Sequence, residues 1–68
     1  MSRLKKIRKA NKMTQTDVAK ALGITQTAYG NYELGKRNPK PEMLRKMSRI
    51  FGCTIDELIE EADDERGA

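Results

Sequence analysis

The sequence contains no histidine and only one cysteine, Cys53, among its 68 residues. One thiol excludes a disulfide within the chain, and without imidazoles the chain can neither complete a zinc site nor form a thiol-imidazole nucleophile. Glycine-rich phosphate loops and acidic residues at calcium-loop spacing are also absent. We therefore predict a protein that is not an enzyme and that needs no metal or small-molecule cofactor.

Long apolar runs and aromatic residues are scarce as well. No segment has membrane-spanning length, and no signal peptide or lipidation motif is present, which predicts a cytoplasmic protein. The aromatic residues are Tyr29, Tyr32 and Phe51, too few for the stacking platform that single-stranded nucleic acids require. A chain this short is expected to form one domain of modest stability, to which dimerisation would add.

Charge is distributed unevenly along the chain. Residues 1–49 carry 13 basic and 3 acidic side chains, a net charge of +10, whereas residues 50–68 carry 1 basic and 7 acidic side chains, a net charge of −6. A concentrated basic segment suits a polyanionic partner, for which duplex DNA fits best. We assign residues 1–60 to a single domain and predict that residues 61–68 form an acidic, disordered tail.

The spacing of apolar residues predicts five helices and no strands. The first extends from Ser2, a suitable N-cap, to about Asn11, and the fourth begins at Pro41. The fifth opens after Thr54, which can form a capping box with Glu57. The expected fold class is therefore all-α, a compact five-helix bundle.

The second and third helices, within residues 15–34, are the part around which the chain is organised. Their apolar positions repeat at helical spacing on both sides of the turn Gly23-Ile24-Thr25. Gly23 can adopt the positive φ that ends the second helix, and Thr25 can cap the third. Such a short turn fixes the angle between the two helices. The outward positions of the third helix are polar or small rather than charged. Such side chains are suited to the recognition of a binding partner.

This arrangement resembles the helix-turn-helix of the phage repressor and Cro family, also called the xenobiotic-response-element family. The resemblance covers residues 3–59. It implies a lambda-repressor-like domain that binds duplex DNA, usually as a two-fold dimer on a palindromic operator, and acts as a repressor-like regulator of transcription. The matching features are Thr14-Gln15, Val18-Ala19, Leu22-Gly23-Ile24, Thr25-Gln26, Glu33-Leu34-Gly35-Lys36-Arg37-Asn38-Pro39 and Phe51-Gly52-Cys53-Thr54-Ile55-Asp56-Glu57-Leu58.

By this resemblance the third helix lies in the major groove, where Gln26, Thr27 and Asn31 meet the edges of the bases. An amide can pair with the adjacent donor and acceptor of adenine, and the methyl group of threonine can contact that of thymine. The alternative for these residues is an ordinary solvated polar face.

The resemblance also implies contacts with DNA phosphates, which position a protein without specifying a sequence. One lies at the start of the second helix, where the helix dipole helps to bind an anion. Three lie on the basic loop after the third helix, for which ordinary solvated surface is the alternative. A last one comes from an arginine that in relatives forms a salt bridge with the counterpart of Glu33. The residues implied are Gln15, Lys36, Arg37, Asn38 and Arg8.

Three residues depart from the family's pattern. Tyr29 stands where a β-branched aliphatic residue is usual, so its hydroxyl must find a partner or reach the edge of the core. Gly30, in the middle of the third helix, costs about 1 kcal/mol relative to alanine. Lys40 stands where a capping serine is common.

The fifth helix carries Ile55, Leu58 and Ile59, which is much apolar surface for the end of so small a chain. We expect these residues to form a dimer interface, with closure of the chain's own core as the alternative. Two other functions stay open at this point. One is an antitoxin or protein-interaction adaptor with the same fold, and the other is binding to a membrane surface through residues 1–12.

Overall fold

The computed structural model describes the backbone of residues 2–59 and the side chains of residues 3–59. This part of the chain contains five α-helices and no strands, which confirms the predicted fold class. The predicted tail, residues 61–68, and the side chain of Ser2 lie outside the described part. The helices are α1 (Ser2–Ala10), α2 (Gln15–Leu22), α3 (Gln26–Leu34), α4 (Pro41–Phe51) and α5 (Ile55–Ile59).

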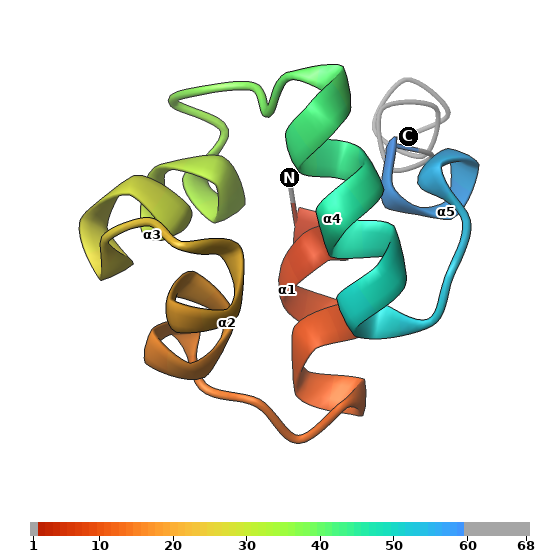
Figure 1. The fold of residues 1–68 in the computed structure, drawn as a ribbon, viewed down its shortest axis with the longest axis horizontal. Coiled ribbons are helices and arrows are strands. Elements are labelled where there is room, and N and C mark those ends of the chain that lie inside the picture. The colour runs from red at the N-terminus through yellow and green to blue at the C-terminus, as the bar shows by residue number, and fades with distance from the viewer. Residues whose placement is uncertain (1, 60–68) are drawn as a thin grey trace.

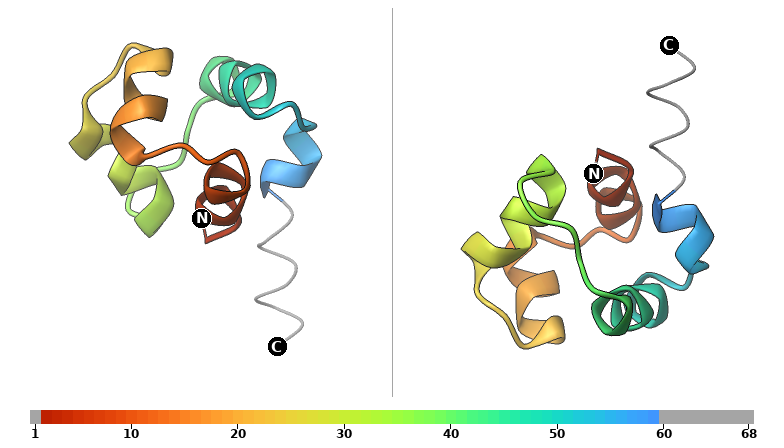
Figure 2. Two further views of the ribbon diagram at one scale, coloured as in Figure 1. Left: turned by 90° about the horizontal axis from the view of Figure 1, so that it is seen from below. Right: turned by 90° about the horizontal axis from the view of Figure 1, so that it is seen from above.

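The five helices form a closed ring around the core. α2 packs against α3, α3 against α1, α1 against α5, α5 against α4, and α4 back against α2. Figure 1 shows α2 and α3 together on one side of the molecule and α5 on the other, and Figure 2 shows the ring from its two ends. The loop of residues 35–40 crosses one end of the ring from α3 to α4 (Figure 2), and Pro39 within it is buried. None of the helices in residues 2–59 has the length and apolar character needed to cross a bilayer.

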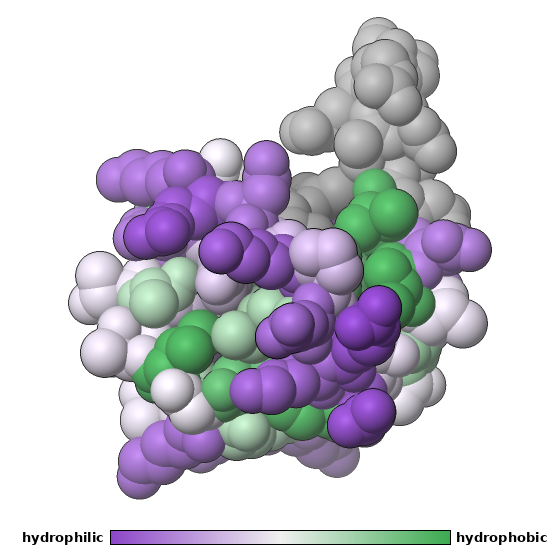
Figure 3. All heavy atoms as spheres, turned by 45° about the horizontal axis from the view of Figure 1, so that its top comes forward, coloured by the Kyte–Doolittle hydropathy of each residue, from purple (hydrophilic) through white to green (hydrophobic). Residues whose placement is uncertain are grey.

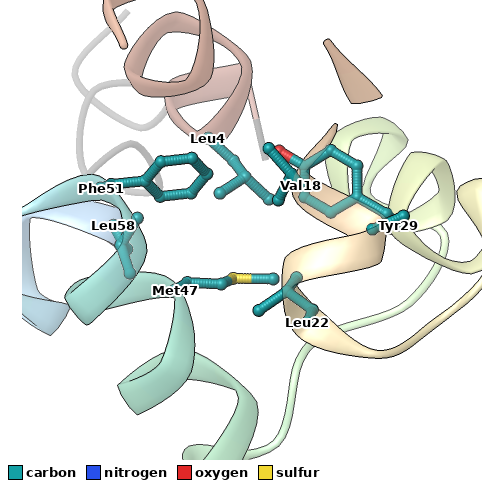
Figure 4. Close-up of a cluster of buried hydrophobic side chains, with 8 residues drawn as sticks. Leu4, Val18, Leu22, Tyr29, Met47, Phe51 and Leu58 are labelled. Atoms are coloured by element: carbon teal, nitrogen blue, oxygen red, sulfur yellow. The ribbon is translucent and has the colours of Figure 1, made fainter. Parts of the chain in front are cut away.

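Every helix contributes at least one side chain to the core. Leu58 of α5 is fully buried, and its helix packs against both α1 and α4. This corrects the prediction that Leu58 belongs to a dimer interface, because none of its surface is left for a second chain to contact. The core residues, most of which are labelled in Figure 4, are Leu4, Val18, Ala19, Leu22, Tyr29, Met47, Phe51 and Leu58.

The turn between α2 and α3 is held by one glycine and a capping threonine. Gly23 has a φ of +75°, and its N–H donates to two carbonyl oxygens in the last turn of α2. Thr25 Oγ1 accepts a hydrogen bond from the Ala28 N–H at 3.1 Å, which caps α3. Ile24 packs against the core between them. The angle between α2 and α3 is therefore set by local contacts and by burial together.

Capping boxes begin both α2 and α5, and the one before α5 is the box that the sequence predicts. Thr14 Oγ1 accepts from the Asp17 N–H at 3.0 Å, and Asp17 Oδ2 accepts from the Thr14 N–H at 2.9 Å. Thr54 and Glu57 repeat this arrangement before α5. Lys40, in contrast, forms no side-chain capping bond at the start of α4.

The end of α1 differs from the prediction by one residue. The helix ends at Ala10 because the chain then turns through Lys12, whose φ is +58°. The Met13 N–H donates to the Arg8 carbonyl oxygen at 3.2 Å and closes the end of the helix. Glycine or asparagine is usual at such a left-handed position, so a lysine there provides no sequence signal for the turn.

Two glycine substitutions are expected to change stability in opposite directions. At Gly30 an alanine Cβ would lie 3.7 Å from Gln15 Oε1, an ordinary contact. Gly30→Ala should therefore raise the free energy of unfolding by about 0.5–1 kcal/mol, because a helix interior favours alanine. Gly23→Ala meets open space but a left-handed backbone, so it should lower the free energy of unfolding by about 1 kcal/mol.

Urea unfolding followed by circular dichroism measures both changes. A Gly30→Ala protein that is less stable than the parent would show that Gln15 packs against α3 more tightly than the 3.7 Å distance from the added Cβ to Gln15 Oε1 implies.

Candidate nucleic-acid interface

The exposed side of α3 carries the three residues that were predicted to contact bases. Gln26 and Thr27 are exposed at its first turn, and Asn31 is half-buried one turn further on. Thr27 and Asn31 are four residues apart, so they lie on one face of the helix. We call Gln26, Thr27 and Asn31 the α3 stripe. Leu34, to which the sequence assigns no contact, continues the same face and is 69% exposed.

The basic loop begins directly beside the α3 stripe. Gly35 ends α3 with a φ of +79°, and the N–H groups of Lys36 and Arg37 both donate to the Asn31 carbonyl oxygen, at 3.0 and 3.3 Å. Lys36, Arg37 and Asn38 are all exposed. Within residues 3–59 neither cation of the loop is engaged in an ion pair. Figure 3 shows that hydrophilic side chains cover much of this face of the molecule, with smaller apolar patches between them.

Arg8 and Glu33 form a buried ion pair that joins α1 to α3. The Arg8 Nε atom lies 2.5 Å from Glu33 Oε2, and Arg8 Nη2 donates to Glu33 Oε1 at 3.3 Å. The Met13 carbonyl oxygen accepts from Arg8 Nη1 at 2.9 Å. All three nitrogens of the guanidinium therefore bind protein acceptors, and Arg8 is only 8% exposed. This geometry corrects the expectation that the salt bridge turns Arg8 toward a phosphate, because the side chain points into the domain.

Gln15 connects this ion pair to the surface of α3. Its Nε2 donates to Glu33 Oε1 at 2.9 Å, and its Oε1 accepts from Gln26 Nε2 at 3.4 Å. We call Arg8, Glu33, Gln15 and Gln26 the Glu33 network. The sequence predicts separate contacts for Gln15 and Gln26 and gives no sign of their connection through Glu33. That connection depends on how α2 packs on α3, and no local pattern in the sequence signals it.

The charges of the network stabilise each other despite burial. Burial by itself would raise the pKa of the Glu33 carboxyl, but hydrogen bonds from Arg8 and Gln15 outweigh it and lower that pKa below its ordinary value. The hydrogen bond to Glu33 in turn raises the pKa of Arg8. Both groups are therefore ionised at neutral pH.

The predicted dimer residues differ in their exposure. Ile59 is 46% exposed and Ile55 is half-buried, whereas Leu58 lies in the core. The Arg3 Nε atom donates to the Glu57 carbonyl oxygen at 3.0 Å and ties α5 to α1. Of the three residues, Ile59 therefore offers the most surface to a second chain.

Comparison with known proteins agrees with this geometry. A family model described as helix-turn-helix matches residues 4–58, which covers both helices of the motif and the helices that support them. The chain belongs to the helix-turn-helix family. The relatives that it matches are named as HTH-type transcriptional regulators, which agrees with the prediction of a protein that is not an enzyme.

Three relatives illustrate the relationship. Over 63 residues the chain is 43% identical to the uncharacterized HTH-type transcriptional regulator YqaE of Bacillus subtilis. This alignment covers 93% of the chain and 54% of the relative. It is 44% identical over 57 residues to the SPbeta prophage-derived regulator YonR of Bacillus subtilis, covering 84% of the chain and 53% of the relative. It is 33% identical over 64 residues to the uncharacterized HTH-type transcriptional regulator MJ0272 of Methanocaldococcus jannaschii. This alignment covers 94% of the chain and 97% of the relative.

The helix-turn-helix protein thus spans about half the length of the two Bacillus relatives. No solved structure matches it.

Acid is expected to weaken the fold partly through Glu33. Because folding lowers the pKa of Glu33, its ionised form stabilises the protein above the ordinary value of 4.5, and this contribution is lost as the pH falls through the lowered pKa. The double variant Arg8→Met with Glu33→Met should lose less free energy of unfolding than the parent between about pH 7 and pH 3.

Urea unfolding at a series of pH values tests this expectation. The single variant Glu33→Gln is the companion measurement: it leaves the Arg8 charge buried without its counter-ion and should cost about 3–5 kcal/mol. An unchanged pH dependence in the double variant would mean that Glu33 titrates alike in the folded and unfolded chains.

Proposed function

We propose that this helix-turn-helix protein binds duplex DNA sequence-specifically and regulates transcription, with α3 in the major groove. The observation that carries the proposal is the α3 stripe: a polar helix face that the ring leaves uncovered and that borders an exposed cationic loop. The relatives that are named as transcriptional regulators support it. A major groove admits one α-helix, and the capped turn after α2 holds α3 at a fixed angle for entry.

The side chains of the α3 stripe suit base edges that offer both donors and acceptors. Gln26 uses one amide N–H on Gln15 and retains its carbonyl oxygen and its other N–H. Those two groups match the N6 donor and N7 acceptor of adenine. Asn31 can make the same pairing one turn along, and the methyl group of Thr27 suits that of thymine.

The groups around the α3 stripe suit the DNA backbone. Lys36, Arg37 and Asn38 lie on an exposed loop tied to the end of α3, and Gln15 begins α2. In this proposal they contact phosphates on the two sides of the groove and hold α3 in register. Arg8 acts differently from the sequence-based expectation, because it supports Glu33 from inside the domain.

We further propose that two copies pair through α5 on a palindromic operator. One recognition helix reads too few base pairs to compete with the non-specific sites of a genome, and two half-sites about 34 Å apart would remove that limit. Ile59, with the exposed part of Ile55, is the apolar surface that supports such pairing.

DNA binding is tested by selecting duplexes from a random pool and measuring affinity by gel shift in rising salt. Gln26→Ala should weaken binding to the selected duplex by about 5- to 150-fold and leave non-specific binding nearly unchanged. Lys36→Ala should weaken both kinds of binding and reduce the salt slope by about one.

The matched control is Lys46→Ala. This exposed lysine lies on α4, which packs mainly against α2 and α5, so its loss should leave the salt slope nearly unchanged. The proposal fails if the parent binds no duplex at moderate salt or enriches no sequence.

Dimerisation is tested with Ile59→Lys, which adds a charge to the proposed surface. Because Ile59 is 46% exposed, the variant should fold normally while its sedimentation mass shifts toward that of a monomer and its affinity for a palindromic duplex falls. Leu58→Ala should instead lower the free energy of unfolding by about 2–5 kcal/mol, since Leu58 is a core residue. A parent protein that stays monomeric on a palindromic duplex would contradict pairing.

A further inference from the structure

The hydroxyl of Tyr29 is the one polar feature of the described core that packing does not explain. Tyr29 is fully buried, and its oxygen forms no hydrogen bond of ordinary geometry with any residue in the described range. A buried hydroxyl without a partner is costly, and phenylalanine would fill nearly the same volume without that cost. The oxygen therefore calls for a reason beyond core packing.

The position of Tyr29 directs its hydroxyl toward the Glu33 network. Tyr29 and Glu33 lie four residues apart on α3, so their side chains share one face of the helix, and both are buried. Figure 4 shows the Tyr29 ring extending from α3 past Val18, with the hydroxyl oxygen at its far end on the side of α1, the helix that carries Arg8. The phenol, the guanidinium and the carboxylate thus meet in one enclosed place between α1 and α3.

Of the two charged groups beside it, only Glu33 can accept a hydrogen bond from the Tyr29 hydroxyl. Burial raises the pKa of the Tyr29 phenol well above its ordinary value, and the Glu33 carboxylate adds to this effect, so the phenol keeps its proton. Arg8 has no acceptor atoms, whereas a carboxylate can accept about four hydrogen bonds. Glu33 can therefore accept a hydrogen bond from the phenol in addition to those from Arg8 and Gln15.

We propose that Tyr29 is a positioning residue for the reading of bases. Its phenol donates a hydrogen bond to Glu33, directly or through one enclosed water. This bond holds in place the carboxylate that orients Gln15 and Gln26. This inference rests on the proposed DNA-binding function and deepens it. Glu33 only accepts hydrogen bonds, so the Gln15 amide must turn its NH₂ group toward Glu33 and its carbonyl oxygen toward Gln26. Gln26 then faces Gln15 with an N–H and keeps its carbonyl oxygen for a base. The orientation of a surface amide is in this way set by a phenol in the core.

The test is Tyr29→Phe, which removes one oxygen and keeps the ring. The first measurement is the pKa of the Glu33 carboxyl in the free protein, from the carbon NMR shift of its side chain. This pKa should rise in the variant, because the ionised carboxylate loses a donor. The second is the preference for the selected duplex over one altered at the base pair that Gln26 reads. That preference should fall by about threefold to tenfold, while non-specific affinity and its salt slope stay the same.

Tyr32→Phe is the matched control, because it removes the same atom from the same helix at a half-buried position. It should leave both the Glu33 pKa and the base preference unchanged. An unchanged Glu33 pKa in Tyr29→Phe overturns the proposed contact, and a raised pKa with an unchanged base preference overturns the positioning role. If the parent itself selects no duplex, the proposed function fails, whereas the pKa measurement on free protein still decides the contact.

Discussion

The ion pair between Arg8 and Glu33 ties α1 to α3 across 25 positions of the sequence and determines how α3 can sit in the ring. Buried charges are tolerated when they are paired and hydrogen-bonded, and here the Glu33 carboxylate accepts from both Arg8 and Gln15 while Arg8 also binds the Met13 carbonyl oxygen. The pair therefore links three helices. An apolar contact at the same place could hold α3 against α1, but it would not orient the amides of Gln15 and Gln26, because dispersion has no direction.

The size of the chain explains why few apolar residues are left for surface roles. A domain this small needs its large apolar side chains in the core, and the ring uses one or more from every helix. α5 is short, and its Leu58 is needed to close the ring between α1 and α4. Among residues 3–59 the large hydrophobic residues that stay exposed are Leu34 and Ile59. They belong to α3 and α5, which lie on opposite sides of the molecule (Figure 1), and they are the apolar surface that an interaction could use.

Much of the candidate interface could be predicted because it depends on local features. Gln26, Thr27 and Asn31 follow a capped turn at helical spacing, and the basic loop follows a glycine that ends α3. The direction of Arg8 could not be predicted, because the resemblance indicates a pairing with Glu33 but not the burial of the guanidinium or its bond to Met13. The connection from Glu33 through Gln15 to Gln26 was missed for the same reason: it joins side chains of different helices.

The sequence by itself determined the helices, the caps before α3 and α5 and the tight turn, since each depends on residues within about four positions of one another. The positive φ of Gly23 and the capping box of Thr54 and Glu57 are examples. Only the tertiary structure decided that Leu58 is core, that Arg8 points inward, and that the hydroxyl of Tyr29 lies beside the network. These outcomes depend on contacts between helices, such as those that join Glu33 to residues 18 and 25 positions away. Contacts between residues so far apart in the sequence depend on how the five helices pack together, which no local pattern specifies.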